Sequence, residues 1–272
     1  MKGFLIALQF LTIIPVKKNL TANETDIAKS ASFFVIVGLF QGILLIAADY
    51  ALGTFFHHGL VIGLLLFLLI ISNGGFHLDG LSDTFDAIAV KSSASNANNI
   101  DVDIQKRLSV MKDSASGPAG VTAIICVLGI KYLSLQNLSH FPYFVYYSSL
   151  LLMPLMSKWT MVFSMYYGTP ARQDGLGRIF IGNIRFKEIA VSTLTLLLVI
   201  ALLSILFSSF MPVSHYFFYP VLLVALYLFV RASVIFFNKK TGGLTGDILG
   251  AISEITEIKF LLMAILWSRL FI

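Results

Sequence analysis

The chain has 272 residues, of which 57% are hydrophobic and only 12% carry a charged side chain. Soluble globular domains carry roughly 25% charged residues, so this composition excludes an ordinary water-soluble protein and indicates a polytopic integral membrane protein. The net charge of +5 is spread along the chain and does not form one basic patch. We therefore expect a lipid bilayer around the chain and no nucleic-acid partner.

The apolar runs, taken in chain order, define the predicted helices. Residues 3–16 are short for a membrane span, and we expect an interfacial or half-buried helix ended by Pro15. At about 20 residues per crossing, the longer runs predict an all-α fold of about seven hydrophobic helices in a single membrane domain, residues 1–272. Whether residues 3–16 and 260–272 cross the bilayer completely stays open. The longer runs are 31–52, 59–73, 118–135, 142–167, 188–211, 216–236 and 260–272.

The segments that connect these runs alternate in charge. Four long segments, 17–29, 74–117, 168–187 and 238–259, hold 14 of the 19 Lys and Arg residues. The short segments near 53–58, 136–141 and 212–215 hold none. Because Lys and Arg mark the cytoplasmic side of a membrane protein, the long segments are predicted to face the cytoplasm from the cell inner membrane.

The acidic residues follow the same distribution, with one exception. Of the 14 Asp and Glu residues, 13 lie in or beside the long segments, and only Asp49 does not. A cation-coupled transporter would place ionisable residues inside its spans. Only Lys131, Lys158 and Arg231 lie there, and each is near a run's end or long enough to snorkel. The pattern therefore favours an enzyme working at the cytoplasmic face.

The segment NGGFHLDGLSDTFD, residues 73–86, follows an uncharged apolar run. On a helix, Asp79, Asp83 and Asp86 point within an arc of about 60°. Like charges held so close repel one another, so we expect a divalent cation among them rather than a solvated acidic face. Oxygen ligands alone favour Mg²⁺ or Mn²⁺ over zinc.

Two further residues of this motif suggest its chemistry. His77 falls about 160° from Asp79 on a helix, which favours a structural or substrate-contacting role over metal binding. Gly80 leaves space through which a phosphate can approach the backbone. Carboxylates, Mg²⁺ and small residues together are typical of phosphoryl transfer.

The other long segments carry candidate partners for this motif. Arg107 and Lys112, in RLSVMKDSASGPAG, suit phosphate binding, although ordinary positive flanking charge explains them equally well. Arg172, in RQDGLGRIF, is a weaker candidate. Asp247 and Glu254 lie seven residues apart in a glycine-rich stretch and share a helical face. A second acidic cluster on the same side of the membrane supports one assembled site.

Four blocks, GGFHLDGLSDTFDA, MKDSASGPAG, ARQDGLG and GGLTGDILGAISEITE, resemble the signature blocks of the cobalamin synthase family, the adenosylcobinamide-GDP ribazoletransferases. The blocks occur in family order, and the opening ALQFLTIIPV also resembles that family. The resemblance implies a Mg²⁺-dependent prokaryotic membrane enzyme with adenosylcobinamide-GDP and α-ribazole, or its 5′-phosphate, as substrates. The products are the cobalamin, or its 5′-phosphate, and GMP. The family's functional positions match His77, Asp79, Asp83, Asp86, Lys112, Asp113, Asp247 and Glu254.

These inferences lead to a provisional division of roles. Asp79, Asp83 and Asp86 are expected to hold Mg²⁺, with Asp83 or Asp86 as the base and Lys112 neutralising phosphate charge. The remaining candidates are expected to bind substrate: His77, Gly80, Arg107, Asp113, Asp247 and Glu254. The exact ligand set, the base, the preferred ribazole and the oligomeric state, a homo-oligomer included, stay open.

Two observations qualify the resemblance. Lys158 stands where the family usually has an arginine, and a lysine keeps the charge but loses the two-pronged geometry. A looser likeness to CDP-alcohol phosphotransferases rests on aspartates around an Asp-Gly pair. The chain lacks the Ala-Arg that follows the glycine in those enzymes and has Leu81, Ser82 and Asp83 instead. A phospholipid synthase of that type is therefore the alternative enzyme.

Overall fold

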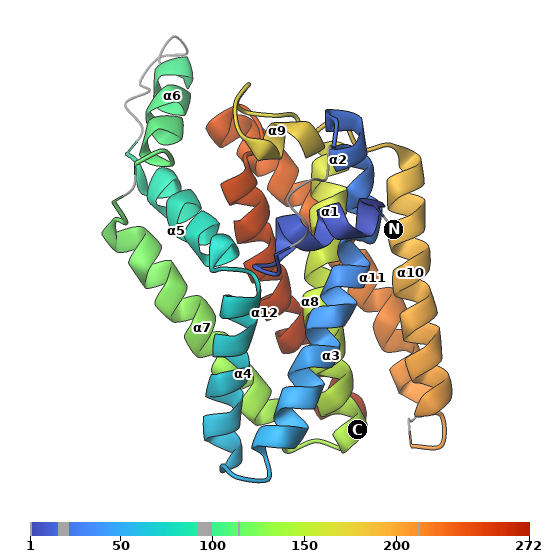
Figure 1. Ribbon diagram of the computed structural model, residues 1–272. Helices are drawn as coiled ribbons and strands as arrows, with labels where there is room; N and C mark the ends of the chain where they lie inside the picture. Colours follow the sequence, from blue (N-terminus) through green and yellow to red (C-terminus); the bar gives the residue numbers. More distant parts are fainter. Residues whose placement is uncertain (1, 16–21, 92–99, 114, 211–212) are drawn as a thin grey trace.

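The computed structural model describes residues 2–15, 22–91, 100–113, 115–210 and 213–272, which form a bundle of helices without strands (Figure 1). The helices are α1 (Lys2–Leu11), α2 (Glu24–Ser30), η1 (Ala31–Phe33), α3 (Phe34–Leu52), α4 (His58–Ser72), α5 (Phe76–Ala89), α6 (Ile100–Val110), α7 (Pro118–Leu138), α8 (Tyr143–Tyr167), α9 (Leu176–Phe180), α10 (Phe186–Leu206), α11 (Val213–Thr241) and α12 (Gly246–Phe271).

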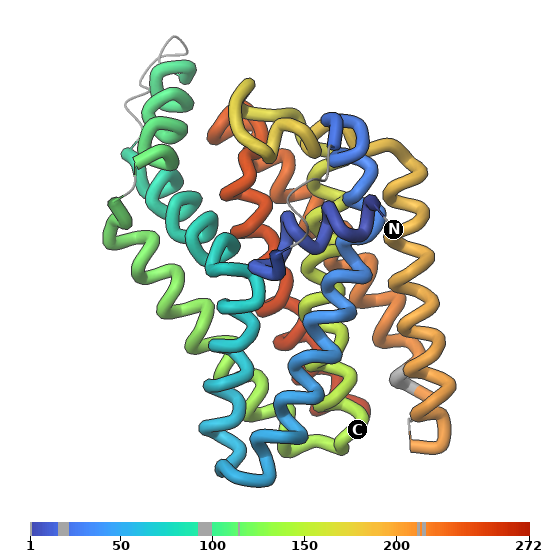
Figure 2. The backbone as a smooth tube through the Cα atoms, viewed as in Figure 1, coloured from blue at the N-terminus to red at the C-terminus, as the bar shows by residue number. Residues whose placement is uncertain are grey.

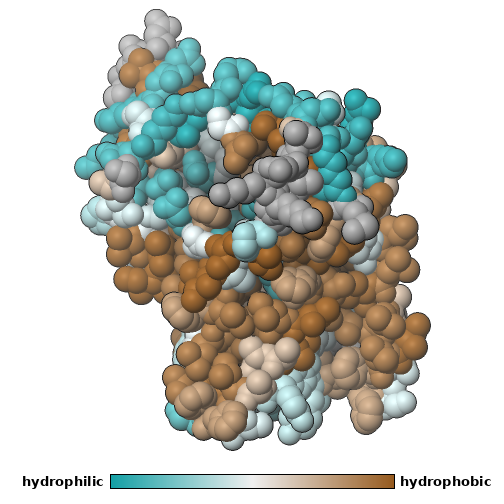
Figure 3. Space-filling view, in the orientation of Figure 1, coloured by the Kyte–Doolittle hydropathy of each residue, from teal (hydrophilic) through white to brown (hydrophobic). Residues whose placement is uncertain are grey.

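The predicted all-α membrane fold is confirmed. Within the described residues, four helical segments are long and apolar enough to cross a bilayer, and α4 with α5 makes a fifth if that bent pair counts as one span. The four segments are Glu24–Leu52, Pro118–Leu138, Phe186–Leu206 and Tyr216–Thr241. Figure 3 shows a broad hydrophobic belt, with hydrophilic side chains gathered at the end where α2, α6 and α9 lie.

The helix α8 lies at the centre of the bundle, and most of its side chains are buried. Helix α3 packs against it through two glycines, Gly38 and Gly42. A Cβ atom added at Gly42 would lie 2.5 Å from the carbonyl oxygen of Leu151 on α8. In lipid, where apolar side chains gain little from leaving the solvent, such small residues let helix backbones approach and pack. This contact anchors the core of the fold.

Helices α4 and α5 are separated by a sharp bend of 86°. Gly74 and Gly75 make the bend with φ angles of 65° and 74°, a left-handed conformation that glycine adopts at little cost. The side chain of Asn73 accepts a hydrogen bond from the Gly75 amide at 3.1 Å. The backbone trace in Figure 2 shows α5 turning away from α4 toward α6 at the polar end. The bend thus carries the acidic motif out of the apolar belt.

The prediction that residues 238–259 form a connecting segment is wrong. Helix α11 continues to Thr241, and α12 runs without a break from Gly246 to Phe271. The connection spans only residues 242–245, so Glu254 and Glu257 lie about two and three turns inside α12. Apolar residues flank them, and the two carboxylates are neutralised inside the bundle, as described below.

The N-terminal segment also ends earlier than predicted. Helix α1 stops at Leu11, four residues before Pro15, and lies across the direction of the main bundle in Figure 1. Thr12 still donates the helical hydrogen bond to the Leu8 carbonyl, but the Ile13 amide donates to the Ser72 carbonyl at the end of α4 instead, at 3.0 Å. The helical pattern therefore ends before the proline is reached.

The distribution of Lys and Arg predicts which ends of the helices face the cytoplasm. Cys126, the single cysteine, is exposed and would first be replaced by alanine. In that background, Gln105→Cys on α6 should react with a membrane-impermeant maleimide only from the cytoplasmic side. Thr54→Cys, after α3, should react only from the opposite side. The reverse pattern would overturn the predicted orientation.

Candidate active site

Two carboxylates on α5 are available to a ligand. Asp79 is exposed and Asp83 is half-buried, and a spacing of four residues puts them on one helical face. No described residue donates a hydrogen bond to either carboxylate. Asp83 also lies within range of the negative charges of Asp79, Asp86 and Asp247. Two free carboxylates in a negative environment are suited to hold a cation.

The third carboxylate of the motif, Asp86, has a structural partner. Its two oxygens accept hydrogen bonds from the amides of Gly117 and Gly120, at 2.7 Å and 2.8 Å. These amides belong to the first turn of α7, whose N-terminal N–H groups have no partner within the helix. Pro118, at the first helical position, contributes no N–H group of its own. Asp86 therefore caps α7 and ties it to α5.

Glycines bring Asp247 next to the α5 carboxylates. A Cβ atom added at Gly80 would lie 2.6 Å from the backbone oxygen of Asp247, so α5 and α12 touch through their backbones. At Gly250, one turn further along α12, an added Cβ would lie 3.1 Å from the Cα atom of His77. The space beside Gly80 is thus filled by α12. The structure does not support the predicted approach of a phosphate there.

Arg172 is the cation that the structure places at this cluster. It lies in the segment between α8 and α9, and its guanidinium is 3.9 Å from the Asp247 carboxylate. It also donates a hydrogen bond of 2.8 Å to the carbonyl of Leu108 on α6. In the sequence analysis Arg172 was a weaker candidate than Arg107 and Lys112, because its motif on its own is not specific. Its place in a glycine-containing turn was the only available signal.

The basic residues of the second motif lie elsewhere. Arg107 is buried and donates a hydrogen bond of 3.2 Å to the carbonyl of Lys240, near the end of α11. Lys112 is exposed and pairs with Asp174 at 2.7 Å. The Lys112 ammonium lowers the pKa of the Asp174 carboxyl below its usual value. Lys112 and Asp174 thus join the α6–α7 connection to the segment that carries Arg172.

Asp113 is also exposed, and its carboxylate accepts a hydrogen bond from the Ala115 amide at 3.1 Å. This contact forms a local turn beside the α7 N-terminus. The structure thus gives Asp113 a local structural partner, and its role in substrate binding stays a prediction.

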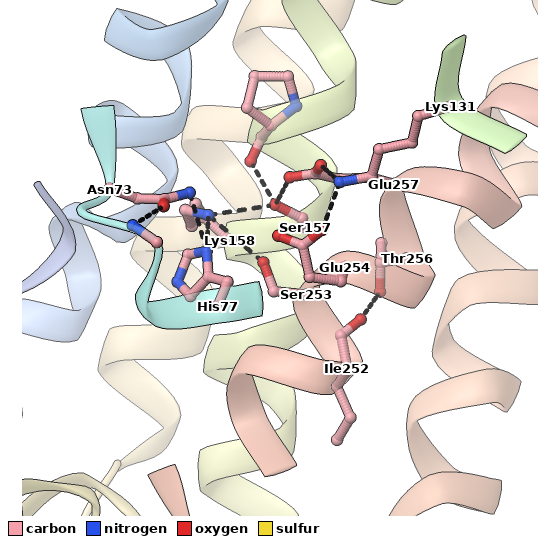
Figure 4. A network of polar contacts seen from close by, with 12 residues as sticks. Asn73, His77, Lys131, Ser157, Lys158, Ile252, Ser253, Glu254, Thr256 and Glu257 are labelled. Atoms are coloured by element: carbon pink, nitrogen blue, oxygen red, sulfur yellow. Dashed lines mark hydrogen bonds and ion pairs between the residues drawn. The ribbon is translucent and has the colours of Figure 1, made fainter. Parts of the chain in front are cut away.

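A second polar group lies deeper in the bundle, and Figure 4 shows it. Lys131 on α7 donates hydrogen bonds of 2.5 Å to both Glu254 and Glu257 on α12. The side chain of Lys131 is only 2% exposed, and Lys158 on α8 is completely buried. The prediction that these lysines can snorkel to water is therefore wrong. The charges of the two lysines and two glutamates balance, and this offsets part of the free-energy cost of burying them.

His77 connects this buried network to the acidic motif. Its Nδ1 atom lies 3.4 Å from Lys158 Nζ and 3.4 Å from Asn73 Nδ2. Lys158 Nζ also lies 3.4 Å from the hydroxyls of Ser157 and Ser253 (Figure 4). The His77 side chain is buried and so points into the bundle.

The structure therefore divides the predicted residues between two places. Asp79, Asp83 and Asp247 gather at the polar end, with Arg172 beside them. His77 and Glu254 belong to the buried network. Although Glu254 and Asp247 share a face of α12, they lie about two turns apart along it.

The available carboxylates suit a Mg²⁺ ion that shares its ligands with a substrate, and they do not suit one held by protein side chains alone. Within the described residues, no group of three His, Cys, Asp or Glu side chains is arranged to hold a metal ion alone. Mg²⁺ commonly takes one or two carboxylates, with substrate phosphates and water as its remaining ligands. Asp79 and Asp83 fit that arrangement, whereas the oxygens of Asp86 are already engaged.

The contacts of Asp86 and Asp83 predict different effects on stability. Asp86→Asn should lower the free energy of unfolding by about 1–2 kcal/mol, because the cap of α7 loses one of two acceptors. Asp83→Asn should cause no loss, because it removes a repelling charge. Thermal unfolding of the purified protein in a buffer with chelator measures both. Equal stabilities for the two variants would refute the capping role of Asp86.

The buried network predicts non-additive effects. Lys131→Met should destabilise the protein by roughly 3–5 kcal/mol, because two buried carboxylates then face Lys158 alone. The double variant Lys131→Met/Glu254→Gln restores the charge balance and should be less destabilised than Lys131→Met. Thermal unfolding of the single and double variants makes this comparison. A double variant whose losses simply add would contradict the proposed pairing.

Comparisons with known proteins agree on one family. The profile described as "Cobalamin-5-phosphate synthase" matches residues 3–265. A protein of Thermodesulfovibrio yellowstonii named "Adenosylcobinamide-GDP ribazoletransferase" is 35% identical over 99% of this chain and 98% of its own length. Proteins with the same name from Alkaliphilus metalliredigens and Acetivibrio thermocellus are each 33% identical over 98% of this chain and over 96% and 99% of their own lengths. No solved structure matches the chain. The chain belongs to the cobalamin-5-phosphate synthase family.

Proposed function

We propose that this protein is an adenosylcobinamide-GDP ribazoletransferase of the cell inner membrane, with its site on the cytoplasmic side. It transfers the phosphocobinamide group of adenosylcobinamide-GDP to α-ribazole or its 5′-phosphate and releases GMP. The observation that carries this proposal is the pair of free carboxylates, Asp79 and Asp83, in a chain that matches these enzymes over nearly its full length.

The reaction requires that a hydroxyl attacks one phosphorus of a pyrophosphate. A ribazole hydroxyl oxygen bonds to the phosphorus nearer cobinamide, the bond between that phosphorus and the bridging oxygen breaks, and GMP departs with the bridging oxygen. Mg²⁺, for which Asp79 and Asp83 would be the ligands, supplies neutralisation of the pyrophosphate charge. The cluster therefore faces the phosphates, and the apolar belt below it faces lipid.

Protein side chains are expected to accept the proton of the attacking hydroxyl and to stabilise the remaining phosphate charge. The attacking hydroxyl must lose its proton, and a carboxylate with an oxygen free of backbone hydrogen bonds is suited to accept it. This favours Asp83 over Asp86, whose two oxygens hold the α7 amides. Arg172 lies beside the cluster and is suited to stabilise phosphate charge. Lys112 is exposed and pairs with Asp174, two residues after Arg172, and we expect it to bind a substrate phosphate when it leaves Asp174.

The buried network supports the site without being part of it. Lys158 and His77 connect α8 to the first turn of α5, so they position the helix that carries Asp79 and Asp83. Lys131 and the two glutamates connect α7 to α12 in the same way. A charge-balanced network of this kind stabilises helix positions and needs no transported ion.

The test is turnover of the purified full-length protein with adenosylcobinamide-GDP and α-ribazole across a Mg²⁺ titration. Asp79→Asn and Asp83→Asn should each lower turnover by about 10² or more, because each removes a charge that orients the reacting group. Asp26→Asn, which replaces an aspartate on α2 paired with Lys2, is the matched control and should retain activity.

Two results would contradict the proposal. Unchanged rates in both α5 variants would show that the cluster is only a solvated acidic face. Release of CMP from CDP-diacylglycerol, with no cobalamin product from the proposed substrates, would identify the protein as a phospholipid synthase.

A further inference from the structure

A cavity lies at the end of the bundle opposite the acidic cluster. Its volume is about 570 Å³, and it opens between the end of α3, the start of α4 and the α7–α8 connection. Its lining includes one carboxylate and several rings: Asp49, Tyr50, His58, His140, Tyr143, Tyr146 and Tyr147. Asp49 is also the single acidic residue that the sequence places away from the long polar segments. The reaction proposed above makes no use of this place.

Asp49 is a buried carboxylate without a cationic partner. Its side chain is 6% exposed, and one oxygen accepts a hydrogen bond of 2.8 Å from the Tyr146 hydroxyl. No Lys, Arg or His of the described chain forms an ion pair with it; the cavity is lined by His58 and His140 but by no Lys or Arg. A buried carboxylate is costly unless it is paired, so this one is suited to receive a cation from outside the chain.

The aromatic residues around Asp49 define the kind of cation. Four tyrosines line the same cavity, and the rings of His58 and Tyr146 lie 5.2 Å apart. The face of a tyrosine ring attracts organic ammonium groups, and several rings beside a carboxylate form the usual environment for them. A metal ion would need more oxygen ligands than this one carboxylate provides. The cavity therefore suits an alkylammonium group.

An apolar groove continues from this cavity along the lipid-facing side of the bundle. It has a volume of about 750 Å³ and shares Tyr50, Tyr143 and Tyr147 with the first cavity. Its remaining walls include Leu151 on α8 with Leu203 and Phe207 at the end of α10. An ammonium pocket joined to an apolar groove matches the two parts of a phospholipid, a charged head group and an acyl chain.

We propose that this end of the bundle binds a phospholipid with an ammonium head group, for which phosphatidylethanolamine is the probe. The ammonium lies among the tyrosines and donates to Asp49, and an acyl chain lies in the groove between α8 and α10. The site is on the membrane leaflet opposite the acidic cluster. The inference does not depend on the proposed function, because none of its residues belongs to that cluster or to the buried network.

The test measures which lipid the full-length protein retains. The protein is reconstituted in vesicles of equal parts phosphatidylethanolamine and phosphatidylglycerol, extracted in mild detergent and analysed by native mass spectrometry. The wild-type protein should retain phosphatidylethanolamine in preference to phosphatidylglycerol. Asp49→Asn keeps an acceptor for Tyr146 but removes the charge, and it should reduce this preference by about tenfold.

Two further variants make the result specific. Tyr50 is 77% exposed, so Tyr50→Leu should leave the fold intact and still weaken the preference. Phe55 is 80% exposed at the same end but does not line the cavity, so Phe55→Leu is the matched control. Equal retention of the two lipids by the wild type would overturn the proposal, as would an unchanged preference in both Asp49→Asn and Tyr50→Leu.

Discussion

The backbone contact between α5 and α12 is the constraint on which the rest of the site depends. Gly80 and Gly250 have no side chains, and this lets the two helices approach until backbone atoms touch. Asp247 then lies next to the carboxylates of α5, although the chain separates them by more than half its length. Any side chain at Gly80 would have to displace the α12 backbone, which cannot yield as a flexible side chain does.

Two further interactions hold these helices in place from either end. At the polar end, Asp86 fastens α5 to the first turn of α7. Deeper in the bundle, Lys131 joins α7 to α12, and Lys158 joins α8 to His77 (Figure 4). The helices that carry the acidic cluster are thus cross-linked by polar contacts. Such contacts are directional, and hydrophobic packing within a lipid environment does not provide that directionality.

The sequence predicts the helices well because hydrophobic runs report burial in lipid directly. Each apolar run corresponds to a helix, although the runs 3–16 and 188–211 extend past the ends of α1 and α10, and the spacing of Asp79 and Asp83 correctly places both on one face of α5. The same spacing correctly places Asp86 on this face, but it does not reveal that Asp86 binds the α7 amides, because these amides come from a distant segment. A signal was present: a helix that begins at Gly117-Pro118 needs an acceptor for its first N–H groups.

The buried network is the main feature that sequence reasoning missed. Lys131 and Glu254 are 123 residues apart, and no local pattern connects them. Hydropathy alone suggested that each lysine side chain reaches water, whereas the structure buries both: Lys131 pairs with the two glutamates, and Lys158 lies beside His77. Two lysines within apolar runs and two glutamates three residues apart were the available clue, since charges buried in a membrane protein must balance.

The central claim is that Asp79 and Asp83 hold a divalent cation with the substrate, while Asp86 serves the fold. Electron paramagnetic resonance of Mn²⁺, added to the full-length protein with adenosylcobinamide-GDP, tests this most directly. The wild type and Asp86→Asn should bind Mn²⁺ with similar affinity, whereas Asp79→Asn and Asp83→Asn should leave most of it free in solution. Mn²⁺ bound equally by Asp83→Asn and the wild type would contradict this assignment.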